Sequence, residues 1–306
     1  MPPSIIECVP NFSEGRRLPV LEALVQSIRA VPAVRLLDVS VDPDHNRAVF
    51  TFAGEGEPVL EAAFRSACVA IERIDLRTHQ GVHPRIGAVD VIPFVPLYDA
   101  TMDACVALAH RLGARLAADP GLPVYLYGRA GSRPSRSLAQ IRRGGFEELR
   151  EAIAQPARAP DLGPARAHPT AGAVAVGARE LLIAFNVDLK STDTMAARAI
   201  ARTVRESSGG LPAVQAMGVP LASRGLVQVS MNLLDYRRTP PLAALRRVEA
   251  EAAQRGVAVA AGELVGCAPP EALPPDPIAA LRLRSLRPGQ ILDPSKLARE
   301  FREDAR

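Results

Sequence analysis

The order of apolar patterns constrains the fold of this 306-residue chain more than any single motif. A strand-like run is followed by a helix-like run with apolar residues at i, i+3, i+4 and i+7, then by two strands, a second helix and a fourth strand. The predicted strands are residues 5–9, 34–41, 48–53 and 89–95, and the predicted helices are residues 18–30 and 58–74. A further helix at 102–118 and a strand at 124–127 extend this β-α-β-β-α-β unit.

The same order recurs in the second half of the chain. The predicted strands there are residues 181–187, 213–219, 226–233 and 257–261, with helices at 192–205 and 242–254 and a last helix near the C-terminus. A repeated β-α-β-β-α-β order indicates two split β-α-β, ferredoxin-like modules. We therefore predict an α+β fold with two ferredoxin-like subdomains, residues 1–177 and 178–306, each with its helices on one face of its sheet.

Composition narrows the class of partner. Hydrophobic residues make up 48% and charged residues 23%, as in ordinary globular proteins. Aromatic residues are only 4% and Trp is missing, which disfavours a surface that stacks on nucleic-acid bases. The net charge of +4 suits an anionic small molecule as well as it suits nucleic acid. The basic cluster Arg142-Arg143-Gly144-Gly145 is interpreted as a solvated loop.

The cysteines and the N-terminus favour a cytoplasmic protein. Cys8, Cys68, Cys105 and Cys267 are scattered without CxxC spacing, so free thiols are preferred to disulfides or zinc ligands. The first residues lead into an apolar strand without a basic signal region. No apolar run is long enough to span a bilayer, so we expect no membrane association.

Residues 78–90, THQGVHPRIGAVD, carry the most chemistry in the fewest residues. His79 and His83 have the i, i+4 spacing of metal ligands on a helix, but Gly81 and Pro84 oppose a helix. We therefore predict no metal site. Histidine can exchange a proton near neutral pH, so His83 is a candidate acid/base. A loop histidine bonded to backbone is an equally good interpretation.

Two acidic residues lie inside apolar strands. Asp90 alternates with Ile92 and Phe94, so it is expected to share their face and, if buried, to need a partner such as Arg85 or a histidine. A structural ion pair is the alternative to a catalytic role. Asp38 either orients an imidazole or satisfies a turn.

Residues 163–172 combine glycine and proline with Arg166 and His168. Glycine lets a backbone approach a ligand closely, and arginine binds carboxylates. A plain interdomain linker explains the same composition.

Several strings resemble, in order, those of the formiminotransferase domain of the formiminotransferase-cyclodeaminase family, the glutamate formimidoyltransferases. They are CVPNFSEG at 8–15, NRAVFTF at 46–52, HPRIGAVDVIPF at 83–94, VYLYG at 124–128, GAR at 177–179, IAFN at 183–186 and QVSMNLLD at 228–235. The similarity covers nearly the whole chain.

The resemblance implies transfer of the formimino group from N-formimino-L-glutamate to tetrahydrofolate, giving 5-formiminotetrahydrofolate and L-glutamate in histidine degradation. The family's catalytic histidine falls on His83. Its folate-binding loop falls on Gly163, Pro164, Ala165, Arg166, Ala167, His168, Pro169, Thr170, Ala171 and Gly172. The loop lacks the Trp of the animal pattern, which weakens any role for it in stacking.

The resemblance also implies tetrahydrofolate as co-substrate, no metal, and a homodimer. Because both substrates carry carboxylates, Arg47, Arg85 and Arg166 are candidate binding residues. Two alternatives remain open: an enzyme that acts on 5-formyltetrahydrofolate, and a folate-binding module without turnover.

Overall fold

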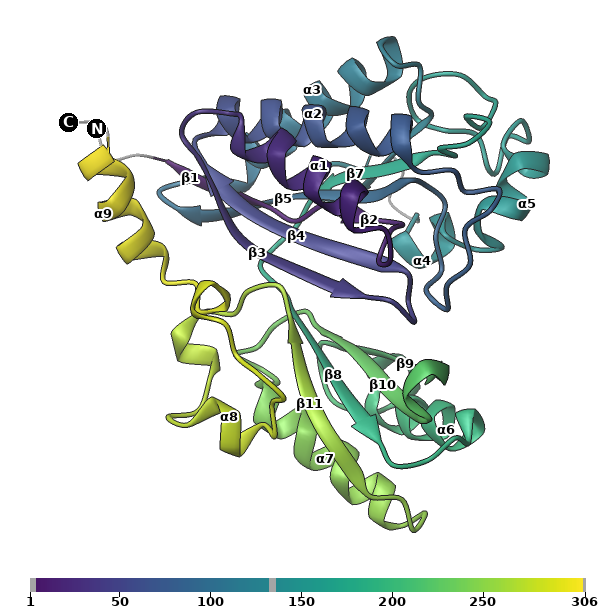
Figure 1. Ribbon diagram of the computed structural model, residues 1–306, viewed down its shortest axis with the longest axis vertical. Helices are drawn as coiled ribbons and strands as arrows, with labels where there is room; N and C mark the ends of the chain where they lie inside the picture. The colour runs from purple at the N-terminus through teal and green to yellow at the C-terminus, as the bar shows by residue number, and fades with distance from the viewer. Residues whose placement is uncertain (1–3, 132–135, 305–306) are drawn as a thin grey trace. The chain divides into compact units, whose positions relative to one another are not determined.

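A computed structural model describes residues 4–131 and 136–304 (Figure 1). The chain divides into two compact units, residues 1–180 with 294–306, and residues 181–293. The first unit contains β1 (Ile5–Cys8), β2 (Asn11–Phe12), α1 (Leu18–Arg29), β3 (Val34–Asp42), β4 (Arg47–Gly54), α2 (Gly56–Arg73), β5 (Val89–Tyr98), α3 (Met102–Ala118), β6 (Val124–Gly128), α4 (Leu138–Ile141), α5 (Gly145–Ala152), β7 (Val174–Ala178) and α9 (Pro294–Asp304).

The second unit contains β8 (Ile183–Leu189), α6 (Thr194–Val204), β9 (Val214–Leu221), β10 (Leu226–Leu233), α7 (Pro241–Ala253), β11 (Val259–Val265) and α8 (Pro277–Ala280). Short 3-10 turns lie at η1 (Glu206–Ser208), η2 (Ala222–Arg224), η3 (Pro270–Ala272) and η4 (Pro288–Gln290). The predicted α+β class with two sheets is therefore confirmed.

The two sheets share one strand arrangement. In the second unit the antiparallel order is β11-β8-β10-β9, so the first strand lies between the fourth and the third. In the first unit β1 likewise pairs with β5 and β4, and β3 lies beyond β4. Strands β7 and β6 then extend the sheet beyond β5 in parallel. The duplication expected from the sequence is thus visible in the order of the strands.

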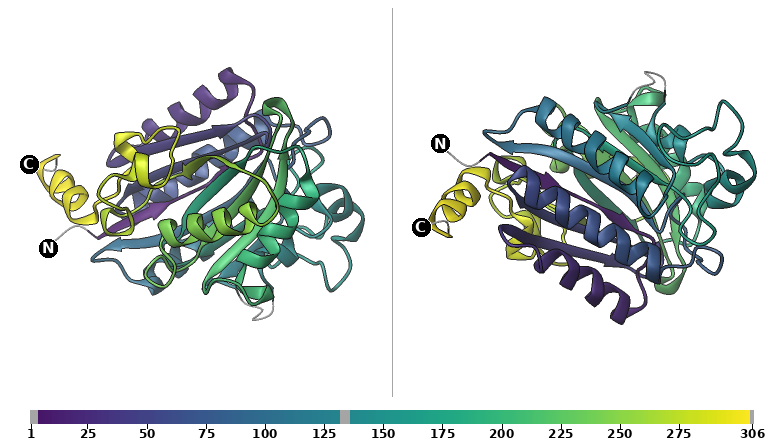
Figure 2. Two further views of the ribbon diagram at one scale, coloured as in Figure 1. Left: turned by 90° about the horizontal axis from the view of Figure 1, so that it is seen from below. Right: turned by 90° about the horizontal axis from the view of Figure 1, so that it is seen from above.

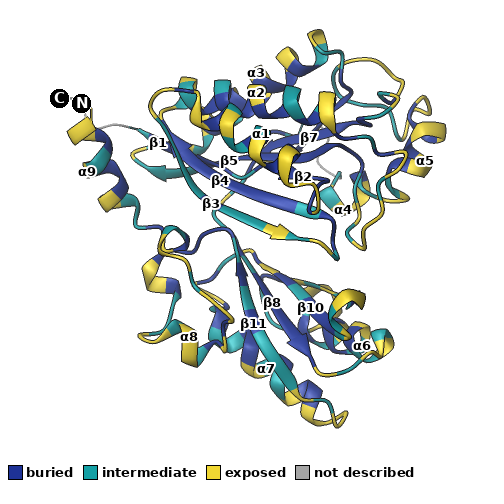
Figure 3. Ribbon diagram, viewed as in Figure 1, coloured by how far each residue is buried: buried dark blue, intermediate teal, exposed yellow. Residues whose placement is uncertain are grey.

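Helices α1, α2 and α3 lie side by side on one face of the first sheet (Figures 1 and 2). Their apolar stripes, such as Leu21, Leu24 and Ile28 of α1, are buried against Phe50, Phe52 and other sheet residues. Figure 3 shows that buried and exposed positions alternate along these helices. Burial of this apolar stripe, rather than helix propensity, is the main source of stability for such helices. The start of α3 is capped by Thr101, whose hydroxyl accepts a hydrogen bond from the Ala104 amide.

One detail differs from the sequence expectation that helices cover a single face. Helices α4 and α5 contribute Ile141 and Leu149 to a separate apolar cluster with Tyr125 and Tyr127 of β6. Those strand residues alternate with Leu126, which belongs to the main core. Both faces of the sheet are therefore covered where β7 and β6 extend it.

The C-terminal helix α9 groups with the first unit, although the sequence expectation placed it in residues 178–306. Arg35 of β3 forms ion pairs with Glu300 and Asp304 of α9, and its guanidinium lies 5.0 Å from the centre of the Phe301 ring. These contacts explain why the end of the chain returns to the first sheet. No described helix has the length and apolar character needed to cross a bilayer.

Candidate functional site

A turn and a loop of the first unit are joined by hydrogen bonds near the N-terminal end of β5. The 42–46 turn between β3 and β4 meets the loop before β5 through the Val82 amide, which donates to the Asp44 carbonyl, and the Asn46 side chain, which donates to the Gln80 carbonyl. A Cβ on Gly81 would lie 2.2 Å from the His45 carbonyl oxygen. Glycine at 81 therefore permits the close approach that brings His45 near the loop of His79 and His83.

A bulge in β5 sets the direction of Asp90. Asn11 pairs with Val91 and Phe12 with Val89, so Asp90 is the extra residue in this stretch of β5. Val89 and Ile92 both join the main core, whereas Val91 joins the other apolar cluster and Asp90 pairs with Arg142, the residue that follows α4. The expectation that Asp90 shares the face of Ile92 and Phe94 is therefore wrong, because a bulge shifts the alternation and re-aims a side chain.

The partners of Asp90 also differ from those expected. Asp90 accepts a hydrogen bond from the Ile86 amide at 2.7 Å and pairs with Arg142 at 2.5 Å. Neither Arg85 nor a histidine fills this role. The Arg142 side chain is only 16% exposed, so the interpretation of this part of the basic cluster as a solvated loop is wrong. A buried carboxylate needs such a counterion.

The two histidines of the loop lie in different surroundings. The Nδ1 atom of His79 accepts a hydrogen bond of 2.7 Å from Arg85 Nε, which can only donate. The proton of His79 therefore lies on Nε2, which donates to the Asn46 carbonyl at 2.9 Å. Burial lowers the His79 pKa, and the neutral ring is held on both sides. With both nitrogens engaged, His79 holds the loop in place and has no lone pair left for a metal.

His83 lies near two cations. Its ring centre is 6.2 Å from that of His45. The pKa of His83 lies well below the ordinary value, first because of burial and then because of Arg47, Arg142 and His45. His83 is consequently neutral at physiological pH, the form required of a base.

Arg47 is the least satisfied cation of this group. Its Nη2 donates to the Asn11 side chain, but its buried Nε has no hydrogen-bond partner within the described chain. The Arg47 pKa is lowered to about 9, first by burial and then by Arg142, while Asp90 and Asp42 act in the opposite direction. An anionic ligand would satisfy both the charge and the free donor.

These side chains line a cavity of about 10 Å³. Asn11, Ser13, His45, Arg47, His83 and Asp90 are among the residues around it. A volume of this size holds about one water molecule. A larger ligand therefore requires the surrounding loops to move.

Residues 163–172 lie against the same loop. Gly87 and Gly172 form a β-bridge, and the Ala88 amide donates to the Ala171 carbonyl. A Cβ on Gly172 would lie 2.1 Å from the Ile86 carbonyl oxygen, and its φ of +70° also favours glycine. The structure therefore joins the two sequence segments that resemble the family's catalytic and folate loops.

Of the remaining candidates, Arg85 lines the cavity, whereas Arg166, His168 and Asp38 do not. Within the 163–172 loop, Arg166 is exposed and His168 accepts from the Ala171 amide through Nδ1. Arg85 pairs with Glu147 at 2.9 Å in addition to His79. Asp38 is buried in β3 and accepts from the Ser40 hydroxyl, and it does not line the cavity.

The sequence analysis missed His45, Asn11 and Arg142. His45 stands in a predicted turn and Asn11 in an unpaired stretch, so neither carries a periodic signal. His45 is nevertheless buried, with its Nδ1 3.9 Å from Asp42 Oδ2. A histidine flanked by Asp42, Asp44 and Asn46 is the one local hint.

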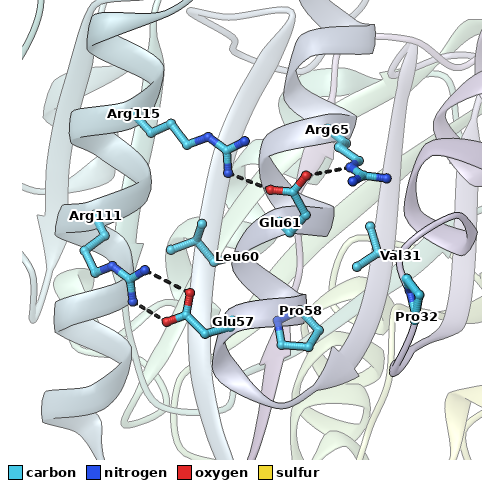
Figure 4. Close-up of a pocket in the computed structure, with 9 residues that line it drawn as sticks. All are labelled: Val31, Pro32, Glu57, Pro58, Leu60, Glu61, Arg65, Arg111 and Arg115. Carbon is cyan, nitrogen blue, oxygen red and sulfur yellow. Dashed lines mark hydrogen bonds and ion pairs between the residues drawn. The ribbon is translucent and has the colours of Figure 1, made fainter.

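A second pocket, of about 510 Å³, lies over α2 and α3 and has a different character (Figure 4). Glu57 pairs with Arg111, and Glu61 pairs with Arg65 and Arg115 (Figure 4). Every charged side chain on its lining thus has an opposite partner. We interpret it as an ion-paired surface between two helices.

The second sheet carries its own polar cluster. Asp188 of β8 pairs with Arg284 and lies 3.6 Å from Arg224, and it accepts from the Gln228 side chain at 2.8 Å. Glu263 of β11 accepts from Asn186 at 3.0 Å. In contrast to the His83 cavity, a carboxylate is at the centre here and the cations surround it.

Comparison with known proteins defines the class. A sequence model of the formiminotransferase domain, N-terminal subdomain, matches residues 5–179, and one of the formiminotransferase domain matches residues 184–275. The chain belongs to the formiminotransferase family.

Particular relatives agree with this assignment. The chain is 44% identical over 293 residues to the glutamate formimidoyltransferase of Thermoplasma acidophilum, covering 95% of this chain and 96% of that protein. It is 42% identical over 270 residues to the Streptococcus pyogenes protein of the same name, covering 88% and 90%. It is also 44% identical over 276 residues to rat formimidoyltransferase-cyclodeaminase, where the match covers 88% of this chain and 51% of that protein.

Proposed function

We propose that this protein is a glutamate formimidoyltransferase, which moves the formimino group from N-formimino-L-glutamate to tetrahydrofolate. The family match over both units supports the activity. The observation that supports the site is a neutral imidazole, His83, beside two arginines and a buried carboxylate. Tetrahydrofolate acts as co-substrate, and the protein works in histidine degradation.

In the proposed reaction, N5 of tetrahydrofolate attacks the formimino carbon and forms a tetrahedral intermediate. The attacking nitrogen becomes cationic and transfers a proton to neutral His83. The protonated imidazole then gives that proton to the glutamate nitrogen as the bond from carbon to that nitrogen breaks. No net proton is gained by the enzyme, and the products are 5-formiminotetrahydrofolate and L-glutamate.

The surroundings of His83 suit both proton transfers. Burial, and after it Arg47 and Arg142, lower the His83 pKa and keep the resting ring neutral, so it is ready to accept a proton. The same cations make the imidazolium a strong acid, which favours release of the proton to the leaving nitrogen. General acid–base catalysis of this kind contributes about 10²–10⁴-fold.

We propose that Arg47 binds a substrate carboxylate and that residues 163–172 bind the folate. Support for Arg47 is its buried Nε, which lacks a hydrogen-bond partner in the described chain. Support for the loop is its pairing with residues 86–88, close along the chain to His83.

We also propose a cytoplasmic homodimer. The support for the cytoplasm is that all four cysteines are free thiols, as the sequence predicted, and Cys8, Cys105 and Cys267 are buried. Sedimentation of the purified chain tests the dimer, and a monomeric mass at micromolar concentration contradicts it.

The test of the function mixes the purified chain with N-formimino-L-glutamate and tetrahydrofolate and follows the folate product optically. We expect turnover with this donor. A parallel reaction with 5-formyltetrahydrofolate and L-glutamate tests the alternative that the enzyme acts on 5-formyltetrahydrofolate. Folate binding without product in either reaction would contradict the proposal and favour a binding module.

A further inference from the structure

A third pocket, of about 520 Å³, lies between β6, helices α4 and α5, and the segment that follows α5. Arg136, Arg143 and Arg158 contribute to its lining, and Glu148 is the one carboxylate that does. All these residues belong to the first unit. The pocket does not share a lining residue with the His83 cavity.

Arg158 is fixed but not neutralised. It donates from Nη1 to the Gln140 carbonyl at 3.0 Å and from Nη2 to the Arg143 carbonyl at 2.7 Å. No carboxylate pairs with it within residues 4–131 and 136–304, and its buried Nε has no hydrogen-bond partner there. Carbonyl groups orient a guanidinium without cancelling its charge, so this cation remains available to an anion.

The pocket over α2 and α3 does not have this excess of arginines over carboxylates. There, Arg65, Arg111 and Arg115 all pair with glutamates (Figure 4). Among the described residues of the third pocket, Arg136 is the one lining arginine with an ion pair, to Asp161 at 3.5 Å. Arg143 is exposed. A lining with three arginines and one glutamate has an excess of positive charge and attracts anions.

The uncharged part of the lining limits the kind of anion. Tyr125 donates its hydroxyl proton to the Arg158 carbonyl at 2.6 Å and its ring lies 5.2 Å from the Arg136 guanidinium, so it offers a ligand no free polar group. Ile141 and Ala152 add aliphatic surface. Glu148 offers an acceptor for an ammonium group. The complementary ligand has two acidic groups, a short aliphatic chain and one amine.

We propose that this pocket binds a free acidic α-amino acid of the L-glutamate type. Two carboxylates of the ligand face Arg143 and Arg158, and its amine faces Glu148. L-glutamate is also a product under the proposed function, so the assignment of a feedback role rests on that function. The binding itself does not depend on it.

A short path joins the pocket to the catalytic cavity. Gln140 and Ile141 line the pocket, and the next residue, Arg142, pairs with Asp90. Asp90 in turn holds the Ile86 amide, three residues after His83. A ligand that moves α4 therefore also moves Arg142, one of the cations that lower the His83 pKa. Occupancy should change turnover without competing for the formimino donor.

Calorimetry of the whole chain with L-glutamate tests the binding. We expect saturable binding that weakens at least tenfold in Arg143→Gln and Arg158→Gln. Arg111→Gln, from the ion-paired pocket, is the matched control and should bind as the wild type does. Arg143 is exposed, so its variant stays informative even if Arg158→Gln, which loses two backbone contacts, fails to fold.

Ligand analogues test the chemistry of the site. L-glutamine lacks one carboxylate and glutarate lacks the amine, and each should bind at least tenfold more weakly than L-glutamate. Glu148→Gln should remove the preference over glutarate. Equal binding of inorganic phosphate, or unchanged glutamate binding in Arg143→Gln, overturns the proposal. So does glutamate inhibition that is purely competitive with the formimino donor.

The proposed function and this inference fail separately. A chain that binds L-glutamate through Arg143 but does not transfer the formimino group refutes the function and keeps the site. Normal turnover with glutamate binding only at the catalytic cavity refutes the site in the third pocket and keeps the proposed function.

Discussion

The polar clusters of the two units have different groups at their centres. In the first unit, neutral His83 lies beside Arg47 and Arg142 and near the Asp90 carboxylate. In the second, Asp188 is surrounded by Arg224, Arg284 and Gln228. The four-strand order is the same in both sheets. A shared strand order therefore does not fix the chemistry, which depends on the residues that each sheet and its loops carry.

The two clusters differ in how completely their charged groups are paired with opposite charges. The carboxylate of Asp188 has its counterions in place, as expected of a group that stabilises a fold. Around His83 the cations outnumber the carboxylates, and Arg47 Nε is a cationic donor without a hydrogen-bond partner within the described chain. In the second cluster the atoms without a hydrogen-bond partner, Asp188 Oδ2 and Gln228 Oε1, are acceptors, and Arg224 and Arg284 supply the opposite charge beside Asp188. A surplus of cationic donors marks a site where an anionic ligand is expected. The predictions below test whether this contrast separates chemistry from stability.

The largest expected effect is on turnover in His83→Gln. We expect kcat/KM to fall by about 10²–10⁴-fold, the usual contribution of a general acid/base, while the thermal midpoint stays close to that of the wild type. Steady-state kinetics and thermal melts on the same preparation measure both. A variant that keeps wild-type turnover removes His83 from the mechanism.

Gly172→Ala tests the pairing of the 163–172 loop with the catalytic loop. The new Cβ meets the Ile86 carbonyl oxygen and the φ of +70° is strained. Gly209→Ala is the matched control, because its φ is +83° and nothing lies within 4 Å of the new Cβ. The control should lose about 1–2 kcal/mol of unfolding free energy from strain alone. Gly172→Ala should lose more and should also weaken folate binding. Equal losses in the two variants contradict the close contact.

Asp188→Asn should lower the stability of the protein more than its turnover, which is the reverse of the pattern expected for His83→Gln. The buried cluster loses a charge-assisted partner for Arg284, so we expect the unfolding free energy in denaturant to fall by about 1–3 kcal/mol. Turnover of the folded protein should change less than tenfold. If turnover is lost while stability is retained, the second cluster belongs to the chemistry and the contrast between the sheets is wrong.

Arg142→Gln tests the electrostatic part of the comparison. Removing this cation raises the His83 pKa toward its ordinary value, and the uncompensated Asp90 acts in the same direction. Because protonated His83 cannot act as a base, the acidic limb of kcat/KM should move to higher pH, by about one unit or less. Arg111→Gln should leave the limb in place. A shift to lower pH contradicts this account.

The smallest effect is expected for His79→Gln. The ring makes two hydrogen bonds that hold the loop, so we expect a loss of about 1–2 kcal/mol in stability and a modest change in turnover. Urea unfolding and steady-state rates give the two values. A loss of activity as large as that of His83→Gln would mean that the histidines share the chemistry.

Periodicity alone was sufficient to predict most elements of the fold. The helix expected at 102–118 and the strand at 226–233 match α3 and β10 residue for residue. Their apolar stripes determine the face that is buried, and turn residues mark their ends. The covering of the second face by α4 and α5 was not predicted, because these helices have four and eight residues and give a weak periodic signal.

The site was predictable only where one segment carried all its parts. His83 stood out because glycine, proline and arginine surround it in a single loop. Arg142 and His45 come from distant parts of the chain, and no local pattern relates them to His83. Asp90 was placed on the wrong face because a bulge interrupts the alternation, and a bulge is set by pairing with β2 rather than by the sequence of β5.

The return of α9 to the first unit has a consequence for synthesis on the ribosome. Residues 294–304 leave the ribosome after residues 181–293, which form the second unit. The first unit therefore gains its last helix and the Arg35 partners Glu300 and Asp304 only after the whole second unit has emerged. The N-terminal unit, although made first, is the last to be finished, and a chain released early would leave Arg35 without these partners.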